Sequence, residues 1–393
     1  IDILQYAAAR HIDILPSMDM PGHSRAAVKA MEARSRQLTA QGDEVGAAQY
    51  LLSESDDTTQ YLSIQNYSDN TINVCLESSY VFIDKVINEI AKLHQQAGVP
   101  LTQYHIGADE TAGAWLDSPA CHQFIENNDF GVTDTSQLGA YFIERISQIL
   151  NDKGIMVAGW SDGMSHTRLA NMPAQVQSHV WENISAGGHK MVHKQANQGW
   201  QTVLSVPEVL YLDMPYGVSP KEHGYYWAAR ALDSYKIFSF MPDNLAANAE
   251  QWFDIEGQSF SLTDGVYKLD EQQQSSLLQA NKAISGISAQ LWSETIRSPQ
   301  LVEYMTFPRL LMVAERAWHQ ADWQVPYQVA GADYNQTSNY FNAEARAMQA
   351  KQWQMLANGI GQKALYKLDI ANIDYRLPVP GAVIKEGKLH MNV

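Results

Sequence analysis

Residues 99–110 read VPLTQYHIGADE, a short apolar run that ends in two adjacent acids, Asp109 and Glu110. The apolar part has the length of a buried strand, with the acids at its carboxyl end. Paired carboxylates are typical of enzymes that cleave glycosidic bonds, but such pairs normally flank the bond from two elements. Neighbours on an extended stretch point to opposite sides. The pair indicates sugar chemistry in an unusual arrangement, and capping of a following helix is the structural alternative.

Strand-like runs alternate with helical patterns on both sides of this stretch, which is typical of βα units around a parallel sheet. The expected strands are 11–19, 101–107, 154–160, 174–181, 201–210 and 286–292. The expected helices are 23–41, 78–98, 117–127, 135–152 and 299–319. A closed barrel of this type needs eight strands. We therefore predict an α/β fold, a (β/α)8 TIM barrel that lacks its first strands in this fragment and is followed by the start of a small β domain.

The same pattern divides the sequence into three expected parts. They are a barrel domain at 1–325 with strands 3 to 8, a helical segment at 326–372, and the start of a β-sandwich-like domain at 373–393. A polar stretch at 42–74 is expected to be a loop. The aromatic-rich insertion at 211–285 is long enough to be functional. Because the sequence begins and ends inside regular patterns, we interpret it as a fragment.

Composition narrows the possible partners. Acids outnumber bases 43 to 27, and the net charge of −16 argues against nucleic acid, which needs a positive surface. No apolar run approaches the roughly 20 residues of a membrane helix, so no membrane span is expected. Hydrophobic residues at 45% and charged residues at 18% predict an ordinary folded core.

Acids and aromatic residues gather at the expected strand ends. They are Asp109, Glu110, Trp160, Asp162, Trp181, Glu182, Tyr211, Asp213, Trp292 and Glu294. The carboxyl ends of parallel barrel strands meet at one mouth, where such enzymes keep their sites. Aromatic rings stack on the apolar faces of sugars, and carboxylates bond to hydroxyls. The pattern therefore predicts a carbohydrate site.

Five motifs carry a resemblance to a known family. In chain order they read DMPGH, HIGADE, AGWSDG, YLDMPY and LWSE. Together they resemble the catalytic domain of the family 20 glycoside hydrolases, the β-N-acetylhexosaminidases, and most closely its bacterial chitobiase branch, over residues 1–323. The resemblance implies release of terminal non-reducing β-linked N-acetylglucosamine from chitobiose and chito-oligosaccharides. It also implies a retaining mechanism in which the 2-acetamido group of the sugar is the nucleophile.

The resemblance implies a role for each catalytic residue. Glu110 protonates the leaving oxygen and then activates water, while Asp109 orients the acetamido group. His23 contacts the catalytic acid, and Tyr211 bonds to the acetamido oxygen. We expect ionised Asp109 to raise the pKa of Glu110, as a general acid requires. The family's carboxylate partner of the histidine and its sugar-gripping arginine belong to strands upstream of Ile1.

The resemblance also implies the sugar-binding residues. Trp160, Trp181 and Trp292 would form an aromatic box, although a tryptophan at a strand end can equally fill a core. Asp213 and Glu294 would bond to distal hydroxyls of the sugar. Trp227, on the insertion, would lie under a second sugar.

Neither a cofactor nor a metal is expected. His189 and His193 in HKMVH have helical spacing, but the glutamate of HExxH is missing, and we expect a solvated helix face. Resemblance to chitobiases implies a bacterial periplasmic, outer-membrane-attached or secreted protein. In such a compartment a Cys75–Cys121 disulfide becomes the expectation, against two buried free thiols.

The expected partners are N-acetylglucosamine-containing oligosaccharides and the upstream part of the same chain. Three alternatives stay open. One is a related family 20 specificity, such as a lacto-N-biosidase or a β-1,6-glucosaminidase. The others are a sugar-binding protein without turnover and a metal hydrolase.

Overall fold

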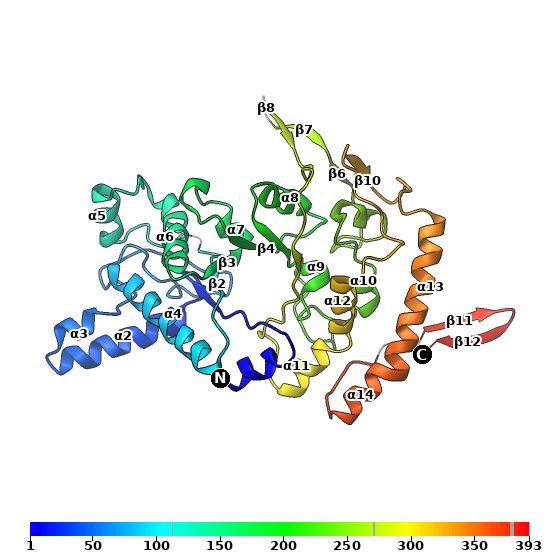
Figure 1. Ribbon diagram of the computed structural model, residues 1–393, viewed down its shortest axis with the longest axis horizontal. Coiled ribbons are helices and arrows are strands. Elements are labelled where there is room, and N and C mark those ends of the chain that lie inside the picture. Colours follow the sequence, from blue (N-terminus) through cyan, green and yellow to red (C-terminus); the bar gives the residue numbers. More distant parts are fainter. Residues whose placement is uncertain (112, 270–271, 378–380, 393) are drawn as a thin grey trace. The chain divides into compact units, whose positions relative to one another are not determined.

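The structure, a computed structural model, describes residues 1–111, 113–269, 272–377 and 381–392 (Figure 1). The chain forms two compact units, Ile1–His179 and Val180–Val393, and each is described separately. The boundary between them lies inside the barrel domain expected at 1–325. Of the β segment expected at 373–393, residues 378–380 and 393 lie outside the described residues.

The first unit is built on parallel strands. In sheet order they are β1 (Ser17–Met20), β2 (Gln103–Gly107), β3 (Met156–Trp160) and β4 (Val176–Val180), whose last residue begins the second unit. Tyr104, His105 and Ile106 of β2 are all buried although successive side chains point to opposite faces. Both faces of this strand are therefore covered, as in α/β proteins.

Helices cover the strands of the first unit. They are α1 (Asp2–Ala8), α2 (Arg25–Ala40), α3 (Glu44–Ala48), α4 (Glu77–Ala97), α5 (Pro119–Asn127), η1 (Thr135–Gln137), α6 (Leu138–Asp152), α7 (Ser161–Met164) and η2 (Leu169–Asn171). Helix α6 buries Phe142, Ile146 and Leu150, three side chains at helical spacing. The expected loop at 42–74 contains helix α3, which begins where the Asp43 side chain accepts a hydrogen bond from the Gly46 amide.

The second unit contains one parallel pair and three antiparallel pairs among its described strands. The parallel pair is β5 (Gln201–Leu204) with β9 (Gly286–Ile287). The antiparallel pairs are β6 (Leu262–Asp264) with β10 (Ala332–Tyr334), β7 (Val266–Leu269) with β8 (Gln272–Ser275), and β11 (Gly381–Lys385) with β12 (Lys388–Asn392). Figure 1 shows β11 and β12 as a hairpin at the end of the chain.

The helices of the second unit differ from the predicted ones in number and length. They are α8 (His189–Asn197), α9 (Pro207–Leu210), α10 (Ser234–Phe238), η3 (Leu245–Glu250), α11 (Pro299–Thr306), α12 (Arg309–Trp318), α13 (Ala343–Gly359), the π-helical turn η4 (Ile360–Ala364) and α14 (Leu365–Ile370). The helix predicted at 299–319 is broken in two because Pro308 lacks the N–H that a helix interior needs.

Two predicted strands are shorter than the sequence suggests. The strand predicted at 201–210 ends at Leu204, because Pro207 begins helix α9 at a position where its missing N–H costs nothing. The strand predicted at 286–292 pairs only at Gly286 and Ile287, followed by an isolated bridge between Tyr211 and Gln290.

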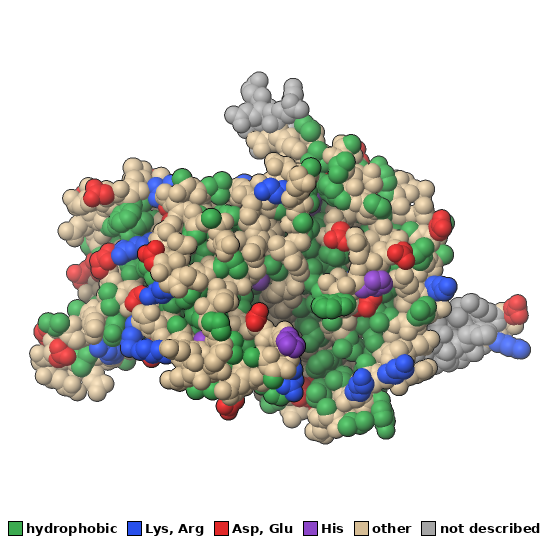
Figure 2. Space-filling model, viewed as in Figure 1, with side chains coloured by type: hydrophobic (Ala, Val, Ile, Leu, Met, Phe, Trp, Pro, Cys, Tyr) green, Lys and Arg blue, Asp and Glu red, His purple; other side chains and the backbone are tan. Residues whose placement is uncertain are grey.

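The core of the second unit includes much of the insertion predicted at 211–285. Leu232, Phe238, Phe240 and Met241 are fully buried there and belong to the main hydrophobic cluster. On the face drawn in Figure 2, acidic side chains are scattered among basic, polar and hydrophobic ones. Among the described residues, no helix combines the length and the apolar character needed to cross a membrane.

Candidate active site

The loop after β2 carries Asp109 and Glu110 in an uncommon backbone conformation. Gly107, Ala108 and Glu110 have φ angles of 74°, 77° and 49°. A Cβ at Gly107 would lie 2.6 Å from the Cα of Asp19, so only glycine allows the ends of β1 and β2 to approach this closely. Non-glycine residues in left-handed conformations cost about 1–3 kcal/mol each and cluster at functional sites.

Helix α7, directly after Trp160, supports this loop. The Glu110 amide donates a hydrogen bond to Asp162 Oδ2 at 3.3 Å. A Cβ at Gly163 would overlap the carbonyl oxygen of Ala108, so the loop and helix α7 pack backbone against backbone. The direction of the Glu110 side chain therefore depends on two residues of the AGWSDG motif.

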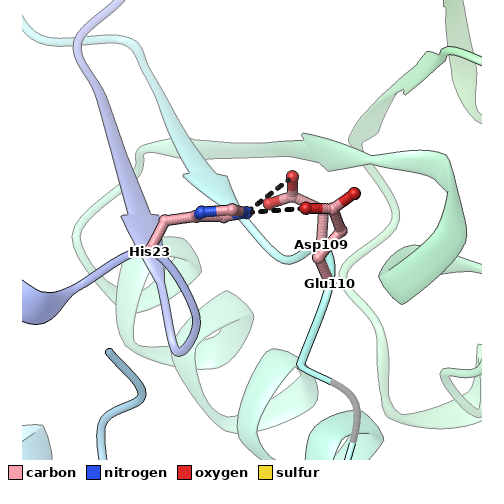
Figure 3. A group of neighbouring side chains, drawn as sticks. All are labelled: His23, Asp109 and Glu110. Carbon is pink, nitrogen blue, oxygen red and sulfur yellow. Dashed lines mark ion pairs between the residues drawn. The ribbon is translucent and has the colours of Figure 1, made fainter. Parts of the chain in front are cut away.

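His23 joins the two carboxylates. Its Nε2 atom lies 3.5 Å from Asp109 Oδ2 and 3.3 Å from Glu110 Oε2. Figure 3 shows the imidazole ring between the ends of β1 and β2, pointing at both acids. His23 itself has a φ of 53°, another left-handed residue in the site. The structure thus brings together Glu110, Asp109 and His23. The sequence predicted them as the catalytic acid, the acid that orients the acetamido group, and the histidine that contacts the catalytic acid.

The pKa of Glu110 is lowered, which contradicts the expectation that Asp109 would raise it. The hydrogen bond from His23 is the largest cause, burial opposes it, and a hydrogen bond from Gln65 Nε2 at 3.1 Å adds to it. The same contacts, to Asp109 and then Glu110, raise the pKa of His23 to about 10. A positive imidazolium between the two acids outweighs the repulsion between them.

Two further residues belong to this site but were not predicted. Burial, and then the charge of Asp109, raises the pKa of Asp19 to about 6. Asp19 stands in the quoted DMPGH motif, so its position at the end of a strand could have identified it. Gln65 lies in the aperiodic stretch at 42–74, where only the length of the loop hinted at a function. We call Asp19, His23, Asp109 and Glu110 the acid cluster.

One oxygen of Asp109 has no partner among the described residues. Oδ1 is buried and accepts no hydrogen bond there, although a buried polar atom normally has one. His23, Asp109 and Glu110 also place one potential ligand atom each within 4.8 Å of one another. The absence of a metal remains a prediction that chelation can test.

Trp160 is buried at the end of β3 with 5% of its surface exposed. Its ring contacts His105 at 4.8 Å and His179 at 5.7 Å between ring centroids. Burial lowers the pKa of both histidines, to about 3 and about 4. Trp160 is therefore packed against neutral imidazoles, and its predicted contact with the sugar remains a prediction.

Four aromatic residues predicted to bind sugar contact one another in the second unit. We call them the aromatic cluster: Trp181, Tyr211, Trp227 and Trp292. The ring centroid of Trp227 lies 6.2 Å from that of Trp181 and 5.9 Å from that of Tyr211. Tyr211 lies 6.0 Å from Trp292, and all three pairs meet edge to face. Trp227 is 49% exposed, so about half of its surface is open to solvent.

Asp213 adjoins the aromatic cluster. Its Oδ1 accepts a hydrogen bond from the Trp292 amide at 3.3 Å. Burial raises the pKa of Asp213 to about 6, and the charge of Glu294 adds to the rise. The structure therefore brings these two predicted acids close enough to interact.

Arg309 fixes the segment that carries Asp213. Its buried guanidinium donates hydrogen bonds to the carbonyl oxygens of Leu212 and Met214, on either side of Asp213. It also stacks on the ring of Tyr216 at 3.7 Å. No local pattern predicted this role, because Arg309 lies in an ordinary amphipathic helix.

The expected solvated face at His189 and His193 is wrong. Both side chains are buried, with 0% and 2% exposed. His193 Nδ1 lies 2.7 Å from the Ser276 carbonyl and His189 Nε2 lies 3.2 Å from the Thr263 carbonyl. Helix α8 therefore packs its histidines against the segment around β6, a contact that helical spacing alone cannot reveal.

Cys75 and Cys121 form a disulfide, with an S–S distance of 2.06 Å and Cα atoms 5.1 Å apart. This is the expected pairing. It links the segment before α4 to helix α5.

Residues 1–321 match the family described as "Glycosyl hydrolase family 20, catalytic domain". The chain belongs to glycosyl hydrolase family 20. Residues 364–393 match a second family, "Chitobiase/beta-hexosaminidase C-terminal domain".

Curated family 20 relatives are similar over almost the whole chain. It is 49% identical to "Beta-hexosaminidase B" of Pseudoalteromonas piscicida over 92% of this chain and 45% of that protein. It is 39% identical to "N,N'-diacetylchitobiase" of Vibrio harveyi over 100% of this chain and 46% of that protein. The chain therefore spans less than half the length of these family 20 relatives.

A solved family 20 structure is also similar. It is the exo-β-N-acetylglucosaminidase of Vibrio harveyi in complex with N-acetylglucosamine, with a TM-score of 0.64 and 29% identity over 96% of this chain and 45% of that one. Together with the parallel strands and their helices, this likeness confirms the α/β fold class of the (β/α)8 barrel family.

Proposed function

We propose that the full-length protein removes terminal non-reducing β-linked N-acetylglucosamine from chitobiose and chito-oligosaccharides. The proposed mechanism retains the anomeric configuration and uses the acetamido group of the substrate as its nucleophile. Family membership and the names of the relatives support the activity.

The observation that carries the mechanism is the geometry of Asp109 and Glu110. Both face one imidazole, yet Asp109 keeps one buried oxygen without a partner among the described residues. A nucleophile would have to lie across the sugar from the acid, as in most retaining enzymes. Asp109 lies beside the proton donor Glu110, where its unpartnered oxygen can instead accept a hydrogen bond from an N–H group of the substrate. The acetamido N–H is such a group.

In the first proposed step the acetamido oxygen attacks the anomeric carbon. The bond from that carbon to the leaving oxygen breaks, and Glu110 gives its proton to that oxygen. The sugar becomes an oxazolinium ion, whose positive charge ionised Asp109 offsets through the N–H. Holding the amide in place converts its attack into a well-oriented intramolecular reaction.

In the second proposed step water attacks the anomeric carbon and the oxazolinium ring opens. Glu110 takes the proton from water, which restores the acid for the next cycle. The contact with His23 lowers the pKa of Glu110 before sugar binds, so Glu110 needs a proton donor for the first step. We propose that the His23 imidazolium, 3.3 Å from Glu110 Oε2, is the source.

The proposed roles of the second unit's residues come from the family resemblance. Tyr211 bonds to the acetamido oxygen, and Asp213 and Glu294 bond to distal hydroxyls. By the same resemblance, Trp160, Trp181 and Trp292 each contact the sugar, and the exposed ring of Trp227 supports a second one. The contacts within the aromatic cluster support a stacking surface.

The experiment is hydrolysis of nitrophenyl β-N-acetylglucosaminide by the full-length protein. Glu110→Gln removes the proton but keeps the size of the side chain, and should lower kcat/KM about 10²–10⁴-fold. Glu126→Gln, an exposed glutamate on α5, is the matched control and should leave the rate unchanged. Full activity in Glu110→Gln would overturn the proposal.

The same assay separates the alternatives. A binding protein without turnover would bind N-acetylglucosamine but release no nitrophenol. Faster release from a nitrophenyl lacto-N-bioside would indicate a lacto-N-biosidase. Loss of activity with a chelator, restored by a divalent cation, would indicate a metal hydrolase.

We also propose that the protein acts in an oxidising compartment, in the bacterial periplasm, on the outer membrane or outside the cell. The Cys75–Cys121 disulfide supports this location, because disulfides persist where thiols are not kept reduced. Alkylation of free thiols in living cells, followed by mass spectrometry, would test it. Modification of both cysteines in the native protein would contradict it.

A further inference from the structure

A cavity of about 690 Å³ lies within the second unit, and the mechanism above makes no use of it. Its wall comes from the segments around α10, around Trp252 and along α13. The volume is in the range of small-molecule sites, which run from roughly 300 to 1,000 Å³. A mono- or disaccharide is of this size.

Three cations line this cavity: Arg230, Lys236 and Arg346. Among the described residues, neither Arg230 nor the ammonium of Lys236 has a hydrogen bond or an ion pair. Arg346 donates a long hydrogen bond of 3.4 Å to the Glu250 carbonyl, and its guanidinium lies 4.7 Å from the ring centroid of Phe341. Three cations around one cavity, none of them in an ion pair among the described residues, are unexpected in a chain with a net charge of −16.

Two acids lie in the wall, Asp233 and Asp254, and the charges of Asp233 and of the buried Glu208 act on Lys236. Asp233 Oδ1 accepts the Lys236 amide at 2.8 Å, and Asp254 Oδ1 accepts the Gln258 amide at 2.7 Å. Both carboxylates therefore already accept a hydrogen bond from a nearby backbone amide. Burial lowers the pKa of Lys236, which a bound anion would reverse.

Aromatic and amide side chains complete the wall. The Lys236 ammonium lies 5.4 Å from the ring centroid of Trp252. Phe253 and Tyr235 also line the cavity and are 54% and 41% exposed. Such rings stack on the apolar face of a sugar. The Gln251 and Gln349 amides also line the cavity, where Gln349 Nε2 donates a hydrogen bond to Gln251 Oε1 at 3.1 Å.

We propose that this cavity binds a sugar that carries an anionic group: a carboxylate, sulfate or phosphate. Lys236 and Arg230 bind the anion and the aromatic residues hold the ring. The site is separate from the residues assigned to hydrolysis, so its ligand is not the substrate of the proposed reaction. The nearest link is Trp227, which directly precedes the cavity residue Ala228.

The test is calorimetric titration of the full-length protein. The anionic probes are D-glucuronate, glucose 6-sulfate and glucose 6-phosphate, which distinguish the three kinds of anion. Methyl D-glucoside is the neutral probe, and none of the four carries the acetamido group that the active site is proposed to need. At least one anionic probe should bind at least about tenfold more tightly than the neutral one, and added salt should weaken it.

Two variants locate the site. Lys236→Met keeps the length of the side chain but removes its charge, and Arg230→Gln changes an exposed side chain that folding does not need. Each should weaken the anionic probe about tenfold, whereas Lys363→Met, an exposed lysine outside the cavity, should not. A circular dichroism melt checks that each variant is folded.

Three results would overturn the proposal. They are equal binding of neutral and anionic probes, unchanged binding in both Lys236→Met and Arg230→Gln, and no binding of any probe at millimolar concentration. Hydrolysis of N-acetylglucosaminides is measured separately. Failure of the anionic probes to bind would therefore not affect the proposed function, and loss of hydrolysis would not affect this proposal.

Discussion

The Nε2 atom of His23 lies 3.3 Å from Oε2 of Glu110. This contact raises the pKa of His23 to about 10 and lowers that of Glu110. At neutral pH and without sugar, the acid cluster therefore holds its proton on the imidazole. This state of protonation can be measured in the stability of the fold.

The first prediction concerns stability and pH. The folded pKa of His23 is about 10 and its ordinary value is 6.5, so the folded state holds an extra proton between these values. The stabilisation from His23 is complete below pH 6.5 and is lost as pH rises towards 10. Relative to His23→Gln, the wild type should lose up to about 1.4 kcal/mol of unfolding free energy per pH unit in this window.

Urea unfolding of both proteins at several pH values from 6 to 9.5 measures this difference. His166→Gln, an exposed histidine, is the control and should show no such trend. A wild-type advantage over His23→Gln that stays constant across the window would contradict a protonated His23.

The second prediction concerns Gly163. Gly163→Ala places a methyl group where the Ala108 carbonyl lies, so the loop must shift or the protein must lose stability. Because misplacement of about 1 Å can cost about 100-fold in rate, kcat should fall by 10–100-fold while KM changes less. Gly359 has open space around it, so Gly359→Ala should leave kcat and KM unchanged. Unchanged kcat in Gly163→Ala would show that helix α7 does not position Glu110.

The third prediction concerns Asp213. Burial raises its pKa from 3.8 to about 6, so ionising it above pH 6 destabilises the fold. The contribution of Asp213 to the free energy of unfolding is most favourable below pH 3.8 and is lost as pH rises to about 6. Asp213→Asn should be more stable than the wild type at pH 7, by up to about 3 kcal/mol, with little difference at pH 4.

The activity of Asp213→Asn should fall even as its stability rises, because the carboxylate is proposed to bond to the sugar. Exposed Asp322→Asn is the control for both measurements. A variant that is less stable than the wild type at pH 7 would mean that Asp213 is well accommodated as an anion.

The fourth prediction concerns the disulfide. Cys75 and Cys121 are 46 residues apart, and cross-linking a loop of this length stabilises a protein by about 2–4 kcal/mol. The Cys75→Ser/Cys121→Ser double variant should lose this much unfolding free energy, and reduction of the wild type should have the same effect. An unaltered denaturation midpoint after complete reduction would exclude a stabilising role.

The sequence was a good guide where local pattern and function coincide. Asp109, Glu110 and His23 follow strands in quoted motifs, and the ends of neighbouring parallel strands meet, so their meeting in space was predictable. Tyr211, Asp213 and Trp292 also meet in the second unit, although Tyr211 follows helix α9 and not a strand. Strand lengths were less predictable, because Pro207 begins a helix within an apolar run that also suits a strand.

The remaining features depend on contacts between distant segments. The pKa of Glu110 is set by the position of the His23 ring and by Gln65, which lie 87 and 45 residues away in the chain. His189 and His193 have the spacing of a helix face, but only their contacts with Thr263 and Ser276 show that this face is buried. Arg309 is buried because four carbonyl oxygens converge on it, which no local pattern reveals.

Cleavage of substrates with fluorinated acetamido groups would most directly show whether the sugar provides its own nucleophile. Fluorine draws electrons from the amide oxygen while changing its size little. If that oxygen attacks, kcat/KM of the full-length protein should fall steeply from the acetyl to the fluoroacetyl, difluoroacetyl and trifluoroacetyl nitrophenyl glycosides. A rate that is indifferent to fluorine, or cleavage of the plain glucoside at a similar rate, would contradict the proposed mechanism.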